Sequence, residues 1–132
     1  MIQPSLLLRR ALLADAIFSG VSAVLLSLGA SALASLLNLP EPLLRETGLF
    51  LVAYTALVGW LSSRSSLPKV PVMAVIAGNA AWTVGSIALL LSGAVAPNAL
   101  GEAFIVAQAI ATGVFAELQY MGLRRSAGEA VA

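Results

Sequence analysis

The sequence predicts an all-α fold: a polytopic integral membrane four-helix bundle of two tandem two-helix hairpins, with both termini inside. The chain of 132 residues is 60% hydrophobic and only 10% charged, and its mean hydropathy is +0.98. A soluble domain carries about 25% charged residues, because a hydrated surface must cover it. Four intervals contain no charge, and they cover residues 16–40, 47–63, 70–101 and 103–116. These intervals predict a single transmembrane domain over residues 1–132.

Each predicted helix is long enough to cross a bilayer core, which requires about 20 mostly apolar residues. The intervals 16–40 and 70–101 reach this length unaided. The second helix reaches it by including Leu43 and Leu44, and the fourth by including Glu117. Prolines mark the connections, since proline is tolerated near a helix start but not in its interior. The predicted helices cover residues 8–37, 43–63, 70–94 and 98–122, and the tail 126–132 is expected to be disordered.

The distribution of positive charge predicts the orientation of the chain. Six of the seven basic residues lie before the charge-free part of the first helix, between the second and third helices, or after the fourth; they are Arg9, Arg10, Arg64, Lys69, Arg124 and Arg125. The other two connections carry three glutamates and Arg45. Because cytoplasmic loops are enriched in lysine and arginine, both termini are expected in the cytoplasm. The expected location is the bacterial inner (cytoplasmic) membrane, as a multi-pass protein.

The hairpins 8–63 and 70–122 are predicted to be copies of one another. Without a gap, residues 14–30 align with residues 78–94, and residues 50–59 align with residues 104–113. This alignment makes Asp15 equivalent to Asn79, and Tyr54 equivalent to Gln108. Parallel repeats of this kind are related by a pseudo-twofold axis along the membrane normal.

Asp15 is the strongest candidate for a functional residue. It lies about 8–9 Å deeper than Arg9 and Arg10 at 1.5 Å per helical residue. An ionised carboxylate in hydrocarbon costs several kcal/mol unless it is paired, hydrated or protonated. Ser19, four residues further on, continues the same face. Two interpretations follow: Asp15 pairs with Arg64, Lys69 or an arginine of another helix, or it is a titrating site.

Glu117 and Asn79 complete the candidate intramembrane site for a proton or cation. Glu117 lies about 10 Å inside the level of Arg124, which is the depth of Asp15 on an antiparallel helix. Two neighbouring carboxylates disfavour joint ionisation and suit proton exchange or cation binding. The alternative is a salt bridge from Glu117 to Arg9, Arg10 or Arg124. Secondary polar positions in the bundle are Ser19, Tyr54 and Gln108, where interhelical hydrogen bonds are worth about 0.6 kcal/mol each.

The chain contains neither cysteine nor histidine, which excludes whole classes of chemistry. Disulfides, thiolate catalysis, iron–sulfur clusters, histidine-ligated haem and the common zinc sites all require these residues. We therefore expect no catalytic residue, no metal and no cofactor. The six cytoplasmic charges are accounted for by topology, so no nucleic-acid partner is expected. The expected partners are the lipid bilayer, a membrane protein or a second copy of the chain, and a bound lipid or hydrophobic ligand.

Three segments resemble a family of small, uncharacterised four-span bacterial inner-membrane proteins. They are LRRALLADA at 8–16, AGNAAW at 77–82 and AELQYMGLRR at 116–125. The resemblance covers most of the chain and implies the fold but no activity. In layout the chain is also similar to small multidrug-resistance exporters, with an acid in the first helix and a tryptophan in the third. Asp15 lies nearer the cytoplasm than the mid-span glutamate of those exporters, and the fourth helix carries acids unlike theirs.

These observations favour a small non-enzymatic membrane protein that acts as a subunit, assembly factor or scaffold of a membrane complex. Short connections and the absence of a chemical motif are typical of such a protein. The alternative is a proton- or cation-linked transporter or channel that uses Asp15 and Glu117. An intramembrane enzyme is the least favoured, because catalysis needs a base and an activated nucleophile, and the sole lysine, Lys69, lies at the interface.

Overall fold

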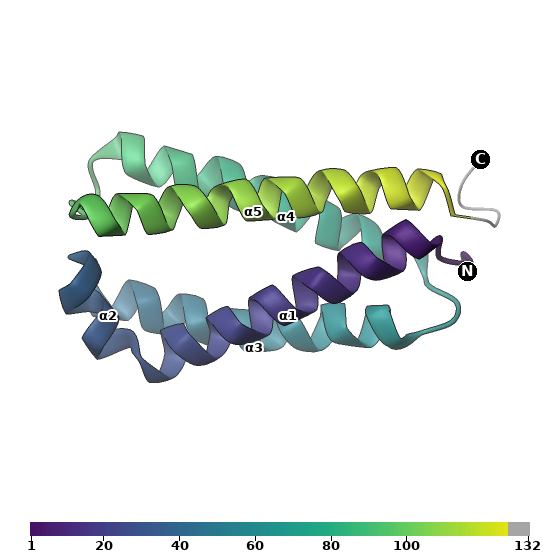
Figure 1. The fold of residues 1–132 in the computed structure, drawn as a ribbon, viewed down its shortest axis with the longest axis horizontal. Coiled ribbons are helices and arrows are strands. Elements are labelled where there is room, and N and C mark those ends of the chain that lie inside the picture. Colours follow the sequence, from purple (N-terminus) through teal and green to yellow (C-terminus); the bar gives the residue numbers. More distant parts are fainter. Residues whose placement is uncertain (127–132) are drawn as a thin grey trace.

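The computed structural model describes residues 1–126, and within them the chain forms five helices in two layers (Figure 1). The helices are α1 (Leu6–Leu28), α2 (Ala30–Leu37), α3 (Glu41–Ser63), α4 (Lys69–Ser92) and α5 (Ala99–Arg124). Most of the tail predicted to be disordered, residues 127–132, lies outside the described part. Ser126 lies inside it and is ordered: its side chain is buried and donates to Gly122 O at 2.7 Å.

The all-α class is confirmed, but the prediction of a four-helix bundle is wrong. The predicted helix 8–37 is interrupted at Gly29, whose φ of −102° and ψ of 14° separate α1 from the eight-residue α2. The first charge-free interval was interpreted as one helix because no proline or charge interrupts it. Glycine adopts a wider range of backbone conformations than other residues. The chain can therefore turn at Gly29 although neither a proline nor a charged residue marks the turn.

Three helices are long and apolar enough to cross a membrane, and they are α1, α4 and α5. These three helices agree with the prediction of a membrane protein. Helix α3 is not among these three, although it has 23 residues. Its first six residues include Glu41, Arg45 and Glu46, which shorten the apolar part of the helix.

The helices pack as a lower layer of α1, α2 and α3 and an upper layer of α4 and α5 (Figure 1). Helix α1 lies along α3, where a Cβ on Gly48 would lie 2.5 Å from Ser27 N. Near its N-terminal end α1 also approaches α5, where a Cβ on Gly122 would lie 2.6 Å from Leu8 Cα. Glycine is therefore required at both crossings, since any side chain would collide with backbone.

The contacts between the two predicted repeats are unequal. Helix α1 packs against α5, whereas α3 and α4, which the repeat makes the equivalent pair, do not pack along their length. The repeat itself stays a prediction. The asymmetry leaves one side of the molecule less closely packed than the other.

The two layers are tied together at both ends. At the end where α1 begins and α5 ends, Ile2 and Leu67 exchange backbone hydrogen bonds of 2.7 and 2.8 Å, and both side chains are fully buried. At the opposite end Asn98 N donates to Leu37 O, and Asn98 Nδ2 donates to Leu36 O at 2.9 Å. Each end also has its own hydrophobic cluster, one around Leu8, Leu12 and Leu61, the other around Leu26, Leu37 and Leu44.

Candidate functional site

A cluster of polar side chains around Asp15 joins all four long helices between the two hydrophobic clusters. The Asp15 side chain is only 1% exposed and accepts four hydrogen bonds. Ser19 Oγ donates to Oδ1 at 2.9 Å, and Oδ2 accepts from Tyr54 OH at 2.6 Å. Oδ2 also accepts from Asn79 Nδ2 and Gln119 Nε2, each at 2.8 Å. We call these five residues the Asp15 cluster.

The Asp15 cluster provides the hydrogen bonds that water would give to a carboxylate. An ionised carboxylate only accepts hydrogen bonds, and all four partners are donors here. Asn79 Nδ2 also donates to Gln119 Oε1 at 2.9 Å, so the two amides bind each other as well as Asp15. Burial without such partners would cost several kcal/mol in hydrocarbon. The Asp15 carboxylate is therefore held in place by uncharged hydrogen-bond donors.

Asp15 forms no ion pair with any lysine or arginine of residues 1–126, contrary to the pairing that the sequence suggested. Arg64 is exposed, and its guanidinium lies 5.4 Å from the ring centroid of Trp60. Lys69 is exposed at the start of α4. Arg9 extends to the backbone, where its Nη1 donates to Ser62 O at 3.4 Å.

The structure does not bring Glu117 to Asp15. Glu117 is exposed and forms no hydrogen bond or ion pair within the described chain, so neither the carboxylate pair nor the salt bridge to an arginine is present. Gln119 occupies the position that Glu117 was expected to fill. The two residues are about 200° apart around the helix axis at 100° per residue.

A signal for Gln119 was present in the sequence. Its spacing continues the buried stripe of α5, which runs through Ala109, Thr112, Ala116, Gln119 and Leu123. Steps of three and four residues keep these side chains on one face. A face of Ala109, Gly113 and Glu117 uses steps of four alone, which drift away from the core because the helix repeats every 3.6 residues.

Gln108 belongs to a second polar group, between α4 and α5. Its Oε1 accepts from Trp82 Nε1 at 2.7 Å, and its Nε2 donates to Ser86 Oγ at 3.0 Å and Ile105 O at 2.7 Å. Tyr54 belongs to the Asp15 cluster instead. The two secondary positions that the repeat makes equivalent therefore have different partners.

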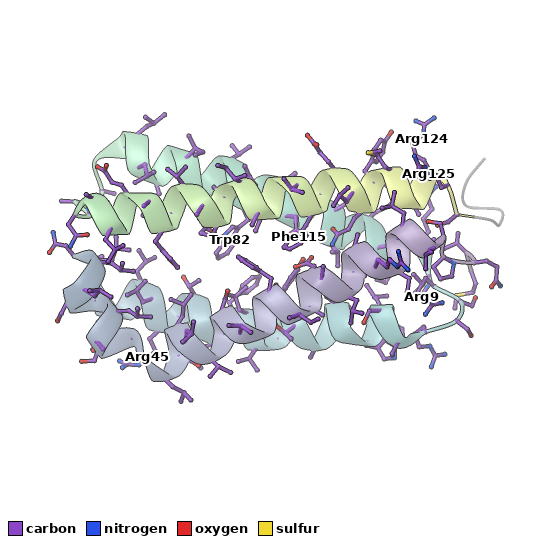
Figure 2. All side chains as sticks on the ribbon, in the orientation of Figure 1. Arg9, Arg45, Trp82, Phe115, Arg124 and Arg125 are labelled. Carbon is purple, nitrogen blue, oxygen red and sulfur yellow. The ribbon has the colours of Figure 1, made fainter. Side chains whose placement is uncertain are left out.

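A cavity of about 580 Å³ lies between the two layers and brings these polar groups to one space. Ser19, Tyr54 and Asn79 of the Asp15 cluster line it, and so do Trp82, Ser86 and Gln108. Most of the remaining wall is aliphatic or aromatic. Asp15 does not line the cavity, because Tyr54 and Asn79 stand between its carboxylate and the space. Figure 2 shows the Trp82 side chain directed into the region between the layers.

The cavity is closed on the α1 and α5 side and open between α3 and α4. Its lining residues Ser19, Leu26 and Ile105 are buried, whereas those on α4 include four exposed small residues. These are Ala74, Gly78, Ala81 and Gly85. We call this opening the lateral portal. It opens to the side of the molecule, toward the surface that lipid would cover in a membrane.

Three aromatic rings lie across the lateral portal. The rings of Phe50 on α3 and Trp82 on α4 are stacked, with centroids 5.9 Å apart and planes at 6°. Phe50 also stacks on Tyr54, with centroids 6.4 Å apart and planes at 21°. The Asp15 cluster and the second polar group are thus connected through aromatic contact at the mouth of the cavity.

Comparison with family models, curated proteins and solved structures finds no significant match. The class of protein therefore follows from the fold and the site alone. Within residues 1–126 the protein is helical, with three candidate membrane-spanning helices and a mostly apolar cavity that opens laterally between α3 and α4.

Proposed function

We propose that this protein is a non-enzymatic integral membrane protein that binds a lipophilic small molecule in the cavity between its layers. The observation that carries the proposal is the cavity itself. Its volume of about 580 Å³ falls within the roughly 300–1,000 Å³ of small-molecule sites, which are mainly apolar with a few fixed polar groups. A guest would reach it from the hydrocarbon core through the lateral portal.

The polar groups of the cavity favour a small molecule. Tyr54, Asn79 and Gln108 lie in a wall that is otherwise mostly aliphatic or aromatic, and a few fixed polar groups in an apolar wall are typical of small-molecule sites. We therefore propose that any action as a subunit, assembly factor or scaffold takes place with this small molecule bound.

The surroundings of Asp15 give less support to proton- or cation-linked transport. That function needs a carboxylate accessible to the transported species. The Asp15 carboxylate lies behind Tyr54 and Asn79 and accepts four hydrogen bonds, and the second acid, Glu117, faces outward. The Asp15 cluster is better suited to positioning Tyr54 and Asn79 on the cavity wall.

We further propose that the protein resides in the bacterial inner membrane with both termini in the cytoplasm. Arg9, Arg124 and Arg125 lie at the end of the molecule where α1 begins and α5 ends (Figure 2). Arg45 lies at the opposite end and pairs with Glu41 at 3.3 Å. This separation agrees with the excess of positive charge on the cytoplasmic side of membrane proteins.

A cavity-filling substitution tests the function. Gly85 lines the cavity, and a Cβ placed on it meets no atom within 4 Å, so the side chain of Gly85→Leu starts in open space and reduces the volume left for a ligand. Gly59→Leu is the matched control, because Gly59 is equally free of neighbours but lies outside the cavity lining. Native mass spectrometry of protein extracted gently from its own membrane should show a small lipophilic adduct on wild type and Gly59→Leu, but not on Gly85→Leu.

Two results would contradict the proposal. In the first, Gly85→Leu retains the adduct, so the guest is bound elsewhere. In the second, wild type is released with a partner protein at fixed stoichiometry and no small molecule, and the protein is then a subunit without a ligand.

A further inference from the structure

We propose that the stacked rings of Phe50 and Trp82 form a gate across the lateral portal, through which an uncharged lipophilic guest exchanges with the bilayer. This inference rests on the proposed function, since a gate requires a guest. The gate would define the route by which the small molecule enters and the two residues that control the rate of its exchange with the bilayer.

The position of the stack is the first argument. Both rings line the cavity, yet Phe50 is 55% exposed, so the stack lies at the mouth and not in the interior. Helices α3 and α4 are not packed along their length. The two rings therefore form a direct side-chain contact across a gap that the backbones leave open.

The two halves of the stack are held differently. Trp82 is anchored to α5 through the hydrogen bond of 2.7 Å from its Nε1 to Gln108 Oε1. Phe50 has no polar anchor, and its remaining ring partner is Tyr54, one turn away on its own helix. Phe50 is thus the half that can rotate. Rotamer changes of exposed side chains take picoseconds to nanoseconds and need no movement of the backbone.

The ends of the molecule would remain in place while the gate opens. The ties between layers lie at Ile2 and Leu67 on one end and at Leu37 and Asn98 on the other, away from the portal. On the α4 side the portal is edged by small residues, including Gly78 and Gly85, which leave room beside the rings. Rotation of the Phe50 ring then widens this opening.

The side chains along the lateral portal favour an uncharged molecule. The mouth presents aromatic rings and small residues, and a charged guest would lose its hydration there without gaining an opposite charge. The carboxylate of Asp15 is covered by its own donors. An uncharged molecule, narrow enough to pass one displaced ring, fits this route.

The first test compares exchange rates in two alanine variants. The probe is 1-aminoanthracene, an uncharged lipophilic fluorophore, and the protein is reconstituted in phosphatidylcholine vesicles in a Trp60→Phe background that leaves Trp82 as the sole tryptophan. Stopped-flow energy transfer from Trp82 reports association and release. Phe50→Ala should speed both rates by a similar factor, roughly two- to tenfold, which is what one aromatic stack is worth. Val52→Ala, an exposed neighbour on α3 outside the lining, should change neither.

The second test locks the portal. The chain has no native cysteine, so Phe50→Cys combined with Trp82→Cys creates a unique pair across the portal. Probe release is followed by the fluorescence of 1-aminoanthracene itself. A reversible bifunctional methanethiosulfonate cross-link should slow release at least several-fold, and reductant should restore it. Each single-cysteine variant treated with the same reagent is the control.

The outcomes separate the gate from the function. If wild type does not bind the probe and carries no native adduct, the proposed function fails and the gate fails with it. If wild type binds but Phe50→Ala and the cross-link leave the rates unchanged, entry occurs elsewhere and only the gate is refuted. If Phe50→Ala slows association and weakens affinity, the ring is part of the binding surface and the gate is again refuted.

Discussion

Replacing Asp15 by leucine or by asparagine should have very different effects on stability. Leucine has the same branched shape with two larger methyl groups in place of the oxygens, and it removes the acceptor of four hydrogen bonds. Asn79 keeps its bond to Gln119 Oε1, and Ser19 can turn to a carbonyl of its own helix. Tyr54 OH and Gln119 Nε2 lose their acceptor. Gln119 is fully buried and Tyr54 half-buried, so at about 1–3 kcal/mol for a buried donor and less for Tyr54 the predicted loss is about 2–4 kcal/mol.

Asparagine preserves most of the same geometry. Its Oδ1 can take the place of Asp15 Oδ2, and its amide nitrogen can donate to Ser19 Oγ, because a hydroxyl accepts as well as donates. The hydrogen bonds become neutral, which weakens them, but the cost of burying a charge is removed. We therefore expect a change within about 2 kcal/mol for Asp15→Asn.

Equilibrium unfolding in mixed detergent micelles, with sodium dodecyl sulfate as the denaturant, would measure both variants against wild type. Glu117→Gln is the matched control, since it also neutralises one acid of the chain but at an exposed position. If Asp15→Asn were as destabilising as Asp15→Leu, a buried cation would have to balance Asp15. The description of the cluster as neutral donors around one carboxylate would then be wrong.

Three further substitutions test the packing. Gly48→Val should destabilise the protein by about 1–3 kcal/mol, because its Cβ would lie 2.5 Å from Ser27 N; Gly59→Val, with no neighbour, is the control in the same unfolding assay. Gln119→Leu should be clearly destabilising and Glu117→Leu nearly neutral, and similar thermal midpoints for the two would refute the assigned face of α5. Asn98→Ala should cost about 1 kcal/mol from loss of the α5 cap, and should speed amide hydrogen exchange at Gly101 relative to residues at the other end of α5.

The sequence allowed the helical ends to be placed well where an explicit signal exists. The fourth helix was predicted to begin at residue 98, and Asn98 caps α5, since its Oδ1 accepts from Gly101 N at 2.8 Å. Pro40 and Pro68 precede α3 and α4. Gly29 had no such signal, so the break between α1 and α2 was missed. A glycine permits a bend, but only the contacts around it decide whether a bend occurs.

The structure brings some of the predicted site residues together and leaves Glu117 apart from them. Asp15 and Asn79 were expected in one site, and a hydrogen bond of 2.8 Å joins them. Ser19 and Tyr54, predicted as secondary positions, donate to the same carboxylate. Glu117 was expected there because it has the appropriate depth and charge. Depth alone does not place a residue on the inner face, and the rotation of α5 brings Gln119 inward instead.

Composition and residue spacing were enough to predict that this protein is helical, that it is apolar enough for a membrane, and which end carries most of its positive charge. These properties follow from composition and spacing, because a chain in hydrocarbon must satisfy its backbone hydrogen bonds within each segment. The tertiary structure decided the rotation of each helix, the break at Gly29, the partners of Asp15 and the cavity between the layers. These depend on contacts between segments far apart in the chain, such as Asp15 with Gln119, and no local pattern specifies which of several similar apolar faces will meet.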